Sequence, residues 1–163
     1  MQDNMLELGG SGFDDSDREF AKQIRQSFAL DDIEATCVRF GLPSNKHALS
    51  EQIEPLYASS TDGIGSTDVG SVSWVVSTVQ CRTASYAVGI PYHFWQLLAQ
   101  GRAPGAHKGM TRAPEPIAGV ASDLFAMPEL LSAAKEAFVR FRQDATFRDP
   151  VGADAKPPLE MSV

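Results

Sequence analysis

His107 is the side chain in this sequence best suited to bind a metal ion. It lies in the segment PGAHKG at residues 104–109, whose small residues would let a ligand approach the backbone closely. Neutral imidazole is the commonest metal ligand among side chains, and functional groups are often carried on loops. We expect His107 just before a helix. An ordinary surface histidine beside a lysine is the alternative, and the local sequence leaves both open.

A second candidate site is the Gly-rich segment GSTDVG at residues 65–70. Asp68 would lie immediately before a strand, where its carboxylate could orient a ligand or accept a hydrogen bond. Thr67, like Ser66, could donate a hydrogen bond to a substrate oxygen. The same residue types are typical of a plain turn, in which an Asp side chain bonds its own backbone. The turn is the commoner explanation on local context.

His93 lies in the aromatic cluster PYHFW at residues 91–95. A histidine in such a cluster is more often partly buried and satisfied than a ligand, and His47, in a variable loop, has no predicted role. Zinc sites need three or four protein ligands, and the chain has 3 His in total. The sequence contains no phosphate-binding loop, no G-x-S-x-G elbow and no H-E-x-x-H motif. A complete catalytic site is therefore not expected in this chain.

The composition limits the possible classes of function. The chain has 163 residues, the size of one domain, and is 43% hydrophobic, which is enough to build a core. Its formal net charge of −7 and its scattered basic residues argue against nucleic acid as a partner. No apolar run approaches the roughly 20 residues that span a bilayer, and the start does not resemble a signal peptide. The 2 Cys, too few for a disulfide framework, fit a cytoplasmic location.

The elements that would position these residues follow from hydrophobic spacing. Phe20, Ala21, Ile24 and Phe28 have helical spacing behind a capping pattern that starts at Ser16. The β-branched and aromatic run VSWVVST predicts a strand at 72–78, and 86–92 is a weaker strand. The predicted elements are helices over 16–28 and 33–40, a loop over 43–65, strands over 72–78 and 86–92, helices over 94–100, 117–125 and from Pro128, and an extended tail from about 143.

This order predicts an α/β fold. Because two strands do not make a stable sheet alone, the chain is expected to form one side of a larger α/β sandwich. We expect residues 1–12 to be a linker and 146–163 to be an extended Pro-containing tail.

Several of these segments resemble one family of enzymes. STDVG at 66–70 with VSWVV at 72–76, and WQL at 95–97 through AHKGM at 106–110, are similar to the aminobenzoyl-glutamate utilization B branch of the aminoacylase/carboxypeptidase metallopeptidases. The likeness extends to Gly12-Phe13, Phe20-Ala21 and the KPP of the tail. It covers nearly the whole chain, but only roughly the C-terminal third of such an enzyme.

The resemblance implies a zinc-peptidase-like three-layer α/β sandwich and a hydrolytic reaction. It implies that residues 1–12 are the exit from an absent lid domain and that 13–145 are the C-terminal segment of the catalytic domain. Members cleave the amide of an N-acyl amino acid, here p-aminobenzoyl-glutamate or a relative. They use two divalent metals, zinc or manganese, and a carboxylate general base. It implies that His107 is the last metal ligand, that Asp68 and Thr67 lie on a substrate-binding acidic loop, and that His93 has a substrate role beside the pocket.

The sequence also departs from the family pattern. The N-terminal half, with the other metal ligands and the general base, is absent, so no catalytic residue is expected in this segment. Ser71 stands where an acidic residue is expected, and the helix after His107 should begin near Glu115, because Pro114 and Pro116 are tolerated only in a first turn. The main hypothesis is part of an active hydrolase, completed by the missing half or by a homo-oligomer. The rivals are a non-catalytic remnant or interaction module, and a folate-related binder without turnover.

Overall fold

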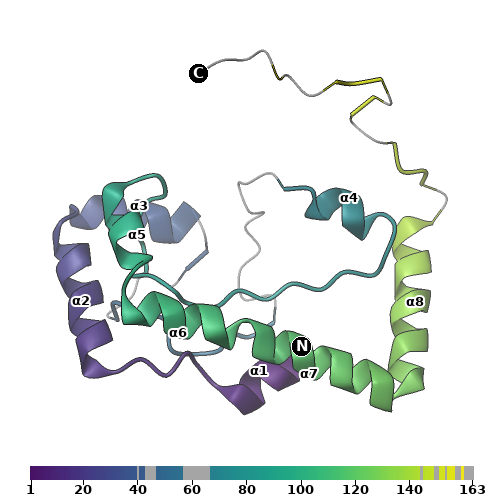
Figure 1. Ribbon diagram of the computed structural model, residues 1–163, viewed down its shortest axis with the longest axis horizontal. Helices are drawn as coiled ribbons and strands as arrows, with labels where there is room; N and C mark the ends of the chain where they lie inside the picture. Colours follow the sequence, from purple (N-terminus) through teal and green to yellow (C-terminus); the bar gives the residue numbers. More distant parts are fainter. Residues whose placement is uncertain are drawn as a thin grey trace. The chain divides into compact units, whose positions relative to one another are not determined.

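A computed structural model of the protein describes residues 1–39, 41–42, 47–56, 67–143, 145–148, 151–152, 154–156 and 159. These residues form eight helices and no strand (Figure 1). The chain divides into two compact units. The first comprises Met1–Gly65 and Val79–Met127, and the second comprises Ser66–Thr78 and Pro128–Val163.

The predicted α/β sandwich is wrong for this part of the chain. The segment predicted as the first strand instead starts within helix α4 (Val69–Ser73) and continues through a turn into an irregular extended run. The second predicted strand, 86–92, is also irregular. β-Branched residues favour strands only where neighbouring strands offer packing partners, and the described residues supply none. The fold they form is helical.

The core of the first unit lies where α2 (Asp15–Gln26) and α3 (Leu30–Arg39) meet residues 87–90. Ala21 and Ile24 are three residues apart on α2, and Ile33 and Cys37 are four apart on α3, so each pair faces inward. The two buried clusters consist of Phe13, Ala21, Ile24, Leu49, Ala87 and Ile90, and of Ile33, Cys37 and Val88.

Residues 87–90 are buried without being a strand, so other groups satisfy their backbone. The Ala87 N–H donates to Gln100 Oε1 at 2.7 Å, and the Val88 N–H donates to the Ala48 carbonyl at 2.8 Å. Gly89 has φ 80°, and a Cβ there would lie 2.6 Å from Ile33 Cγ2. Only glycine fits both that backbone conformation and that close approach.

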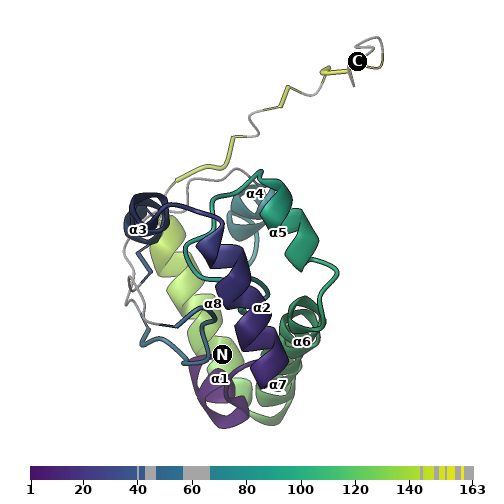
Figure 2. The ribbon, with the colours of Figure 1, turned by 90° about the vertical axis from the view of Figure 1, so that its left-hand side faces the viewer.

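The predicted helices over 16–28 and 94–100 are confirmed, as α2 and α5 (Trp95–Gln100). The cap of α2 is shifted, because Asp14 rather than Ser16 is its N-cap and Asp17 completes the capping box. In Figure 2, α2 runs from its start beside α6 (Pro104–Arg112) towards α3 and α5.

Helix α6 continues directly into α7 (Pro114–Ala126), and the two helices lie end to end in Figure 1. Ala113 between them has the helical dihedrals φ −57° and ψ −43°. Pro114 is the first residue of α7, where a missing N–H costs least. The prediction that this helix begins near Glu115 is confirmed within one residue.

Residues 2–8, predicted as part of a polar linker, form helix α1 (Gln2–Leu8), which packs against α7. Asn4 Nδ2 donates to Asp123 Oδ2 at 3.0 Å. The contact is close, because a Cβ on Gly119 would lie 2.5 Å from Asn4 Nδ2. The linker segment therefore contributes to the first unit.

The second unit contains α4 and α8 (Pro128–Arg142). Its contacts are aromatic, with the Trp74 ring 6.3 Å from both Phe141 and Phe147. Ser77 Oγ also donates to the Ala134 carbonyl at 3.1 Å. Helix α8 confirms the predicted start at Pro128, and Phe141 near its end is 72% exposed.

Some predictions fall on residues outside the described ranges. They concern most of the loop over 43–65, Ser66 and much of the tail. The described part of that loop, 47–56, has no helix or strand. No single described helix is long and apolar enough to cross a membrane. Helices α6–α7 and α8 taken together, with the break between them, have a length and composition that a bent membrane span could have, and this rests on length and composition only.

Candidate functional site

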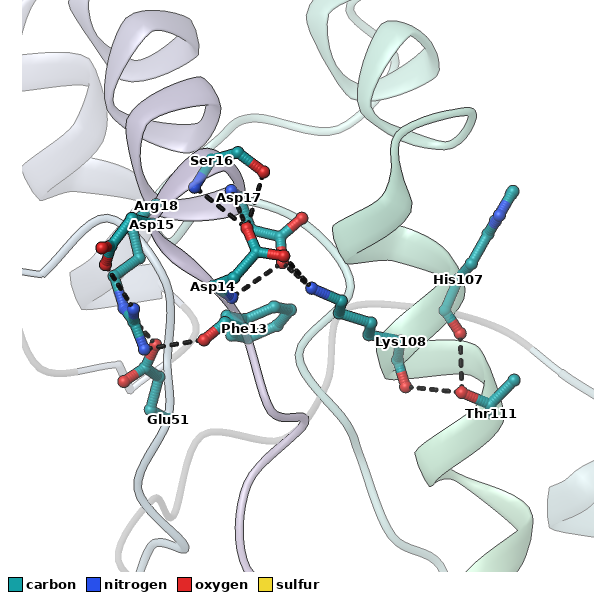
Figure 3. Close-up of polar contacts among 10 residues, drawn as sticks. All are labelled: Phe13, Asp14, Asp15, Ser16, Asp17, Arg18, Glu51, His107, Lys108 and Thr111. Carbon is teal, nitrogen blue, oxygen red and sulfur yellow. Dashed lines mark hydrogen bonds and ion pairs between the residues drawn. The ribbon is translucent and has the colours of Figure 1, made fainter.

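His107 lies inside helix α6, not on a loop before a helix. Pro104 starts α6 at its first position, three residues before the histidine. The Thr111 hydroxyl donates to the His107 carbonyl at 3.0 Å, which ties the backbone of the next turn. The imidazole is exposed and points away from the acidic residues at the start of α2 (Figure 3). It is therefore held on a rigid element and open to a ligand.

The neighbouring residue, Lys108, anchors α6 to the start of α2. Its Nζ lies 2.5 Å from Asp17 Oδ2 and 2.6 Å from Asp14 Oδ2 (Figure 3). Asp17 is 5% exposed, and a buried carboxylate requires such a partner. The same two aspartates form the capping box of α2. We call this group of three residues the lysine clamp.

Charge within the lysine clamp shifts the pKa values of Asp14 and Lys108. The hydrogen bond from Lys108, and then that from Ser16, hold the pKa of the Asp14 carboxyl well below its usual range. The hydrogen bonds to Asp14 and Asp17 in turn raise the pKa of Lys108. All of these shifts favour the charged forms, so the clamp is an ion pair at neutral pH.

Close packing fixes the other side of α6. A Cβ on Gly109 would lie 2.0 Å from the Ala84 carbonyl oxygen, so only glycine allows this approach. Thr83 Oγ1 donates to the Gly109 carbonyl at 2.9 Å, which joins the same two segments. At Gly105 a Cβ would lie 3.3 Å from Asp17 Oδ1. The small residues around His107 therefore let α6 approach its neighbours in this unit.

His93 has an unusual backbone conformation. Its φ is 67°, in the left-handed region that a non-glycine residue rarely occupies. Such strain is often found at functional sites. The preceding residue, Tyr92, accepts a hydrogen bond from the Tyr86 hydroxyl at 2.9 Å. Both tyrosines line a cleft of about 940 Å³ in the first unit. His93 is next to Tyr92 in the sequence but is not one of the residues that line the cleft.

Thr67 and Asp68 behave as turn residues. Both side chains are exposed, and Thr67 Oγ1 accepts a hydrogen bond from the Val69 N–H at 3.1 Å. Asp68 is the N-cap of α4 without a side-chain capping bond. The local turn bond is therefore made by Thr67, and the Asp68 carboxylate makes no capping bond to the backbone of α4.

The four predicted site residues are divided between the two compact units. Thr67 and Asp68 belong to the second unit, and His93 and His107 belong to the first. Across the residues that the structure describes, no group of three or more His, Cys, Asp or Glu side chains could hold a metal ion. A metal site needs several ligands, so His107 does not make one with the residues placed around it.

Sequence reasoning missed the lysine clamp. The signals were present, because a lysine stood beside the best histidine candidate and a capping pattern ran through Asp17. The ion pair between Lys108 and Asp17 could not be predicted from the sequence, because the two residues are 91 positions apart in the chain.

Nearly the whole chain is similar to a curated protein of Escherichia coli strain K12. The two sequences are 30% identical over 172 aligned residues, which cover 98% of this chain. That relative is a subunit of p-aminobenzoyl-glutamate hydrolase. The resemblance predicted from the sequence is confirmed. This chain spans 36% of the length of the E. coli subunit, which is consistent with a C-terminal portion. No protein-family profile and no solved structure matches the chain.

Proposed function

We propose that this chain forms part of an amidohydrolase that cleaves an N-acyl amino acid such as p-aminobenzoyl-glutamate. The observation that supports the proposal is the similarity to the E. coli p-aminobenzoyl-glutamate hydrolase along almost the full chain. The reaction adds water across one amide bond and releases p-aminobenzoate and glutamate. The proposal extends to a cytoplasmic location.

In this proposal His107 is one ligand of a divalent metal, zinc or manganese. Its support is an exposed imidazole on a helix that the lysine clamp and the Gly109 contact hold in place. The remaining ligands would come from the part of the enzyme that corresponds to the uncovered length of the E. coli subunit. His93, Thr67 and Asp68 are assigned to substrate binding, and the strained backbone of His93 favours its role.

The test is reconstitution. The chain is mixed with a polypeptide that comprises the part of the E. coli subunit it does not cover, and release of p-aminobenzoate is followed with added zinc or manganese. We expect turnover that a chelator abolishes. His107→Ala should remove that turnover, whereas the matched control His47→Ala should retain it.

Two outcomes would contradict the proposal. Turnover that survives His107→Ala would remove this residue from the metal site. Failure to restore turnover when the two polypeptides are shown to associate would favour the alternative, a non-catalytic remnant or interaction module.

A further inference from the structure

The apolar surface of α6 and α7 is only partly covered within its unit. Successive residues of a helix are rotated by about 100°. Residues spaced along one side are buried, and they are Ala106, Gly109 and Pro116. A second row runs beside them and is exposed. We call it the exposed stripe, and it consists of Met110, Ile117, Ala121 and Phe125.

Members of the exposed stripe are seven, four and four residues apart, which keeps them on one side of a continuous helix. Met110 is 64% exposed, Ile117 is 55% exposed and Phe125 is 91% exposed. Polar residues occupy the opposite side, and they are Lys108, Thr111, Arg112, Glu115 and Ser122. The helix is therefore amphipathic, with an apolar side wider than the surface it buries.

Single exposed hydrophobic residues are normal on a protein surface. An aligned row of them, bordered by polar residues, instead marks a surface that another element covers. The helix is continuous between Met110 and Ile117, because Ala113 keeps helical dihedrals and Pro114 starts α7 directly after it. The stripe therefore lies along one side of the joined helices α6 and α7.

His107 lies on the same side of the helix as the exposed stripe. It precedes Met110 by three residues, so the two side chains are neighbours on the helix surface. Both are exposed. A partner that packs along the stripe would reach the imidazole at its end.

We propose that the exposed stripe is a docking surface for the polypeptide equivalent to the uncovered part of the E. coli subunit. This inference rests on the proposed function. The chain spans 36% of that subunit, so most of the subunit has no counterpart here that could cover the stripe. In the proposed function the uncovered polypeptide also supplies the remaining metal ligands, so docking along the stripe would bring it to the exposed His107.

The experiment measures association without requiring activity. The full chain is labelled, and its affinity for the uncovered part of the E. coli subunit is measured by fluorescence anisotropy in the presence of a chelator. Ile117→Glu and Phe125→Glu should each weaken binding at least about tenfold, since docking would bury an unpaired charge. The matched control Ser122→Glu, on the polar side of α7, should bind as the wild type does.

The lone chain separates the alternatives. Its temperature of half-unfolding should be unchanged by Ile117→Glu and Phe125→Glu, because both side chains are exposed. A lower temperature would show that the chain covers the stripe itself, and it would overturn the proposal. If light scattering shows that the lone chain is a dimer and that these variants dissociate it, the stripe belongs to a second copy and the proposal is overturned. Equal binding of the E. coli polypeptide by all variants would also overturn the proposal. Stripe-dependent binding without turnover would support the docking surface and count against the hydrolase proposal alone.

Discussion

Lys108 Nζ lies 2.5 Å from Asp17 Oδ2, and this ion pair joins the helix that carries His107 to the start of α2. Asp17 is buried and Lys108 is partly exposed. The pair connects an element late in the chain to one near its beginning. It therefore sets the position of α6 in the first unit.

Replacing Lys108 with methionine should destabilise the first unit. The substitution keeps a chain of similar length but leaves the buried Asp17 carboxylate without its cation, and an uncompensated buried charge is strongly unfavourable. We expect the midpoint of thermal unfolding to fall by several degrees, as followed by circular dichroism. The matched control is Lys22→Met, which removes an exposed ion pair at 3.7 Å and should change the midpoint little.

A double-mutant cycle assigns that loss to the pair. Combining Lys108→Met with Asp17→Asn should cost less than the sum of the two single substitutions, because both remove the same interaction. Additive losses would mean that the two residues stabilise the unit independently.

The charge of Asp14 should make part of the stability depend on acid pH. Lys108 and Ser16 hold the pKa of this carboxyl in the folded protein below its ordinary 3.8. A depressed folded pKa stabilises the protein above 3.8 and loses that contribution as the pH falls through the folded value. Asp14→Asn removes this charge but keeps a good N-cap residue. Its temperature of half-unfolding should therefore be below that of the wild type at pH 5 to 8, because only the contribution of the charge is lost.

That difference between the wild type and Asp14→Asn should shrink as the pH is lowered below about 4. In a Lys108→Met background the difference should be small at every pH, because the largest cause of the shift is gone. A difference that stayed constant down to pH 2 would show that the Asp14 charge does not stabilise the fold.

Gly109→Ala should be among the more damaging single-methyl substitutions in α6. The new Cβ would lie 2.0 Å from the Ala84 carbonyl oxygen, so the backbone must move, and such overpacking costs roughly 1–3 kcal/mol. Chemical denaturation measures this cost. Gly70→Ala in α4 is the control, because nothing lies within 4 Å of its added Cβ, and it should stabilise by about 0.4–1 kcal/mol. Equal effects at both positions would rule out the close approach at Gly109.

Local signals in the sequence predicted α2, α3, α5, α7 and α8, but not α1, α4 or α6. Ala21 and Ile24 are inward on α2 because helical spacing needs only neighbouring residues, and Pro114 and Pro128 start helices for reasons of local backbone geometry. The predicted strand at 72–78 failed because β-branched residues require partner strands, which the described residues do not provide.

The candidate site was harder to predict, because it too depends on contacts between segments that are distant in the sequence. His107 could be chosen from its small neighbours, but the contacts that hold it come from segments distant in the chain, at Asp17 and at Ala84. The left-handed backbone of His93 is a second example, since nothing in PYHFW marks a positive φ at a non-glycine residue. Contacts of this kind depend on the tertiary structure.

The Tyr86–Tyr92 pair should make the first unit sensitive to alkaline pH. Burial first, and then the hydrogen bond that the Tyr86 hydroxyl donates to Tyr92, raise the pKa of Tyr86 well above its ordinary 10.0. A group whose pKa is raised in the folded protein contributes its full stability below pH 10, and that contribution is lost as the pH rises above 10. The temperature of half-unfolding of the wild type should therefore decrease when the pH is raised from 10 to 12. The decrease should be smaller for Tyr86→Phe.

Tyr92→Phe distinguishes the two causes of this shift. It removes the hydrogen bond but leaves Tyr86 half-buried, so most of the alkaline loss should persist, because burial is the larger cause. Ultraviolet difference absorbance of tyrosinate, recorded on the same samples, should show a late-ionising tyrosine in the wild type and in Tyr92→Phe but not in Tyr86→Phe. A wild-type titration that is complete near pH 10 would show that Tyr86 is solvated and that the packing of residues 86–92 is looser than the structure indicates.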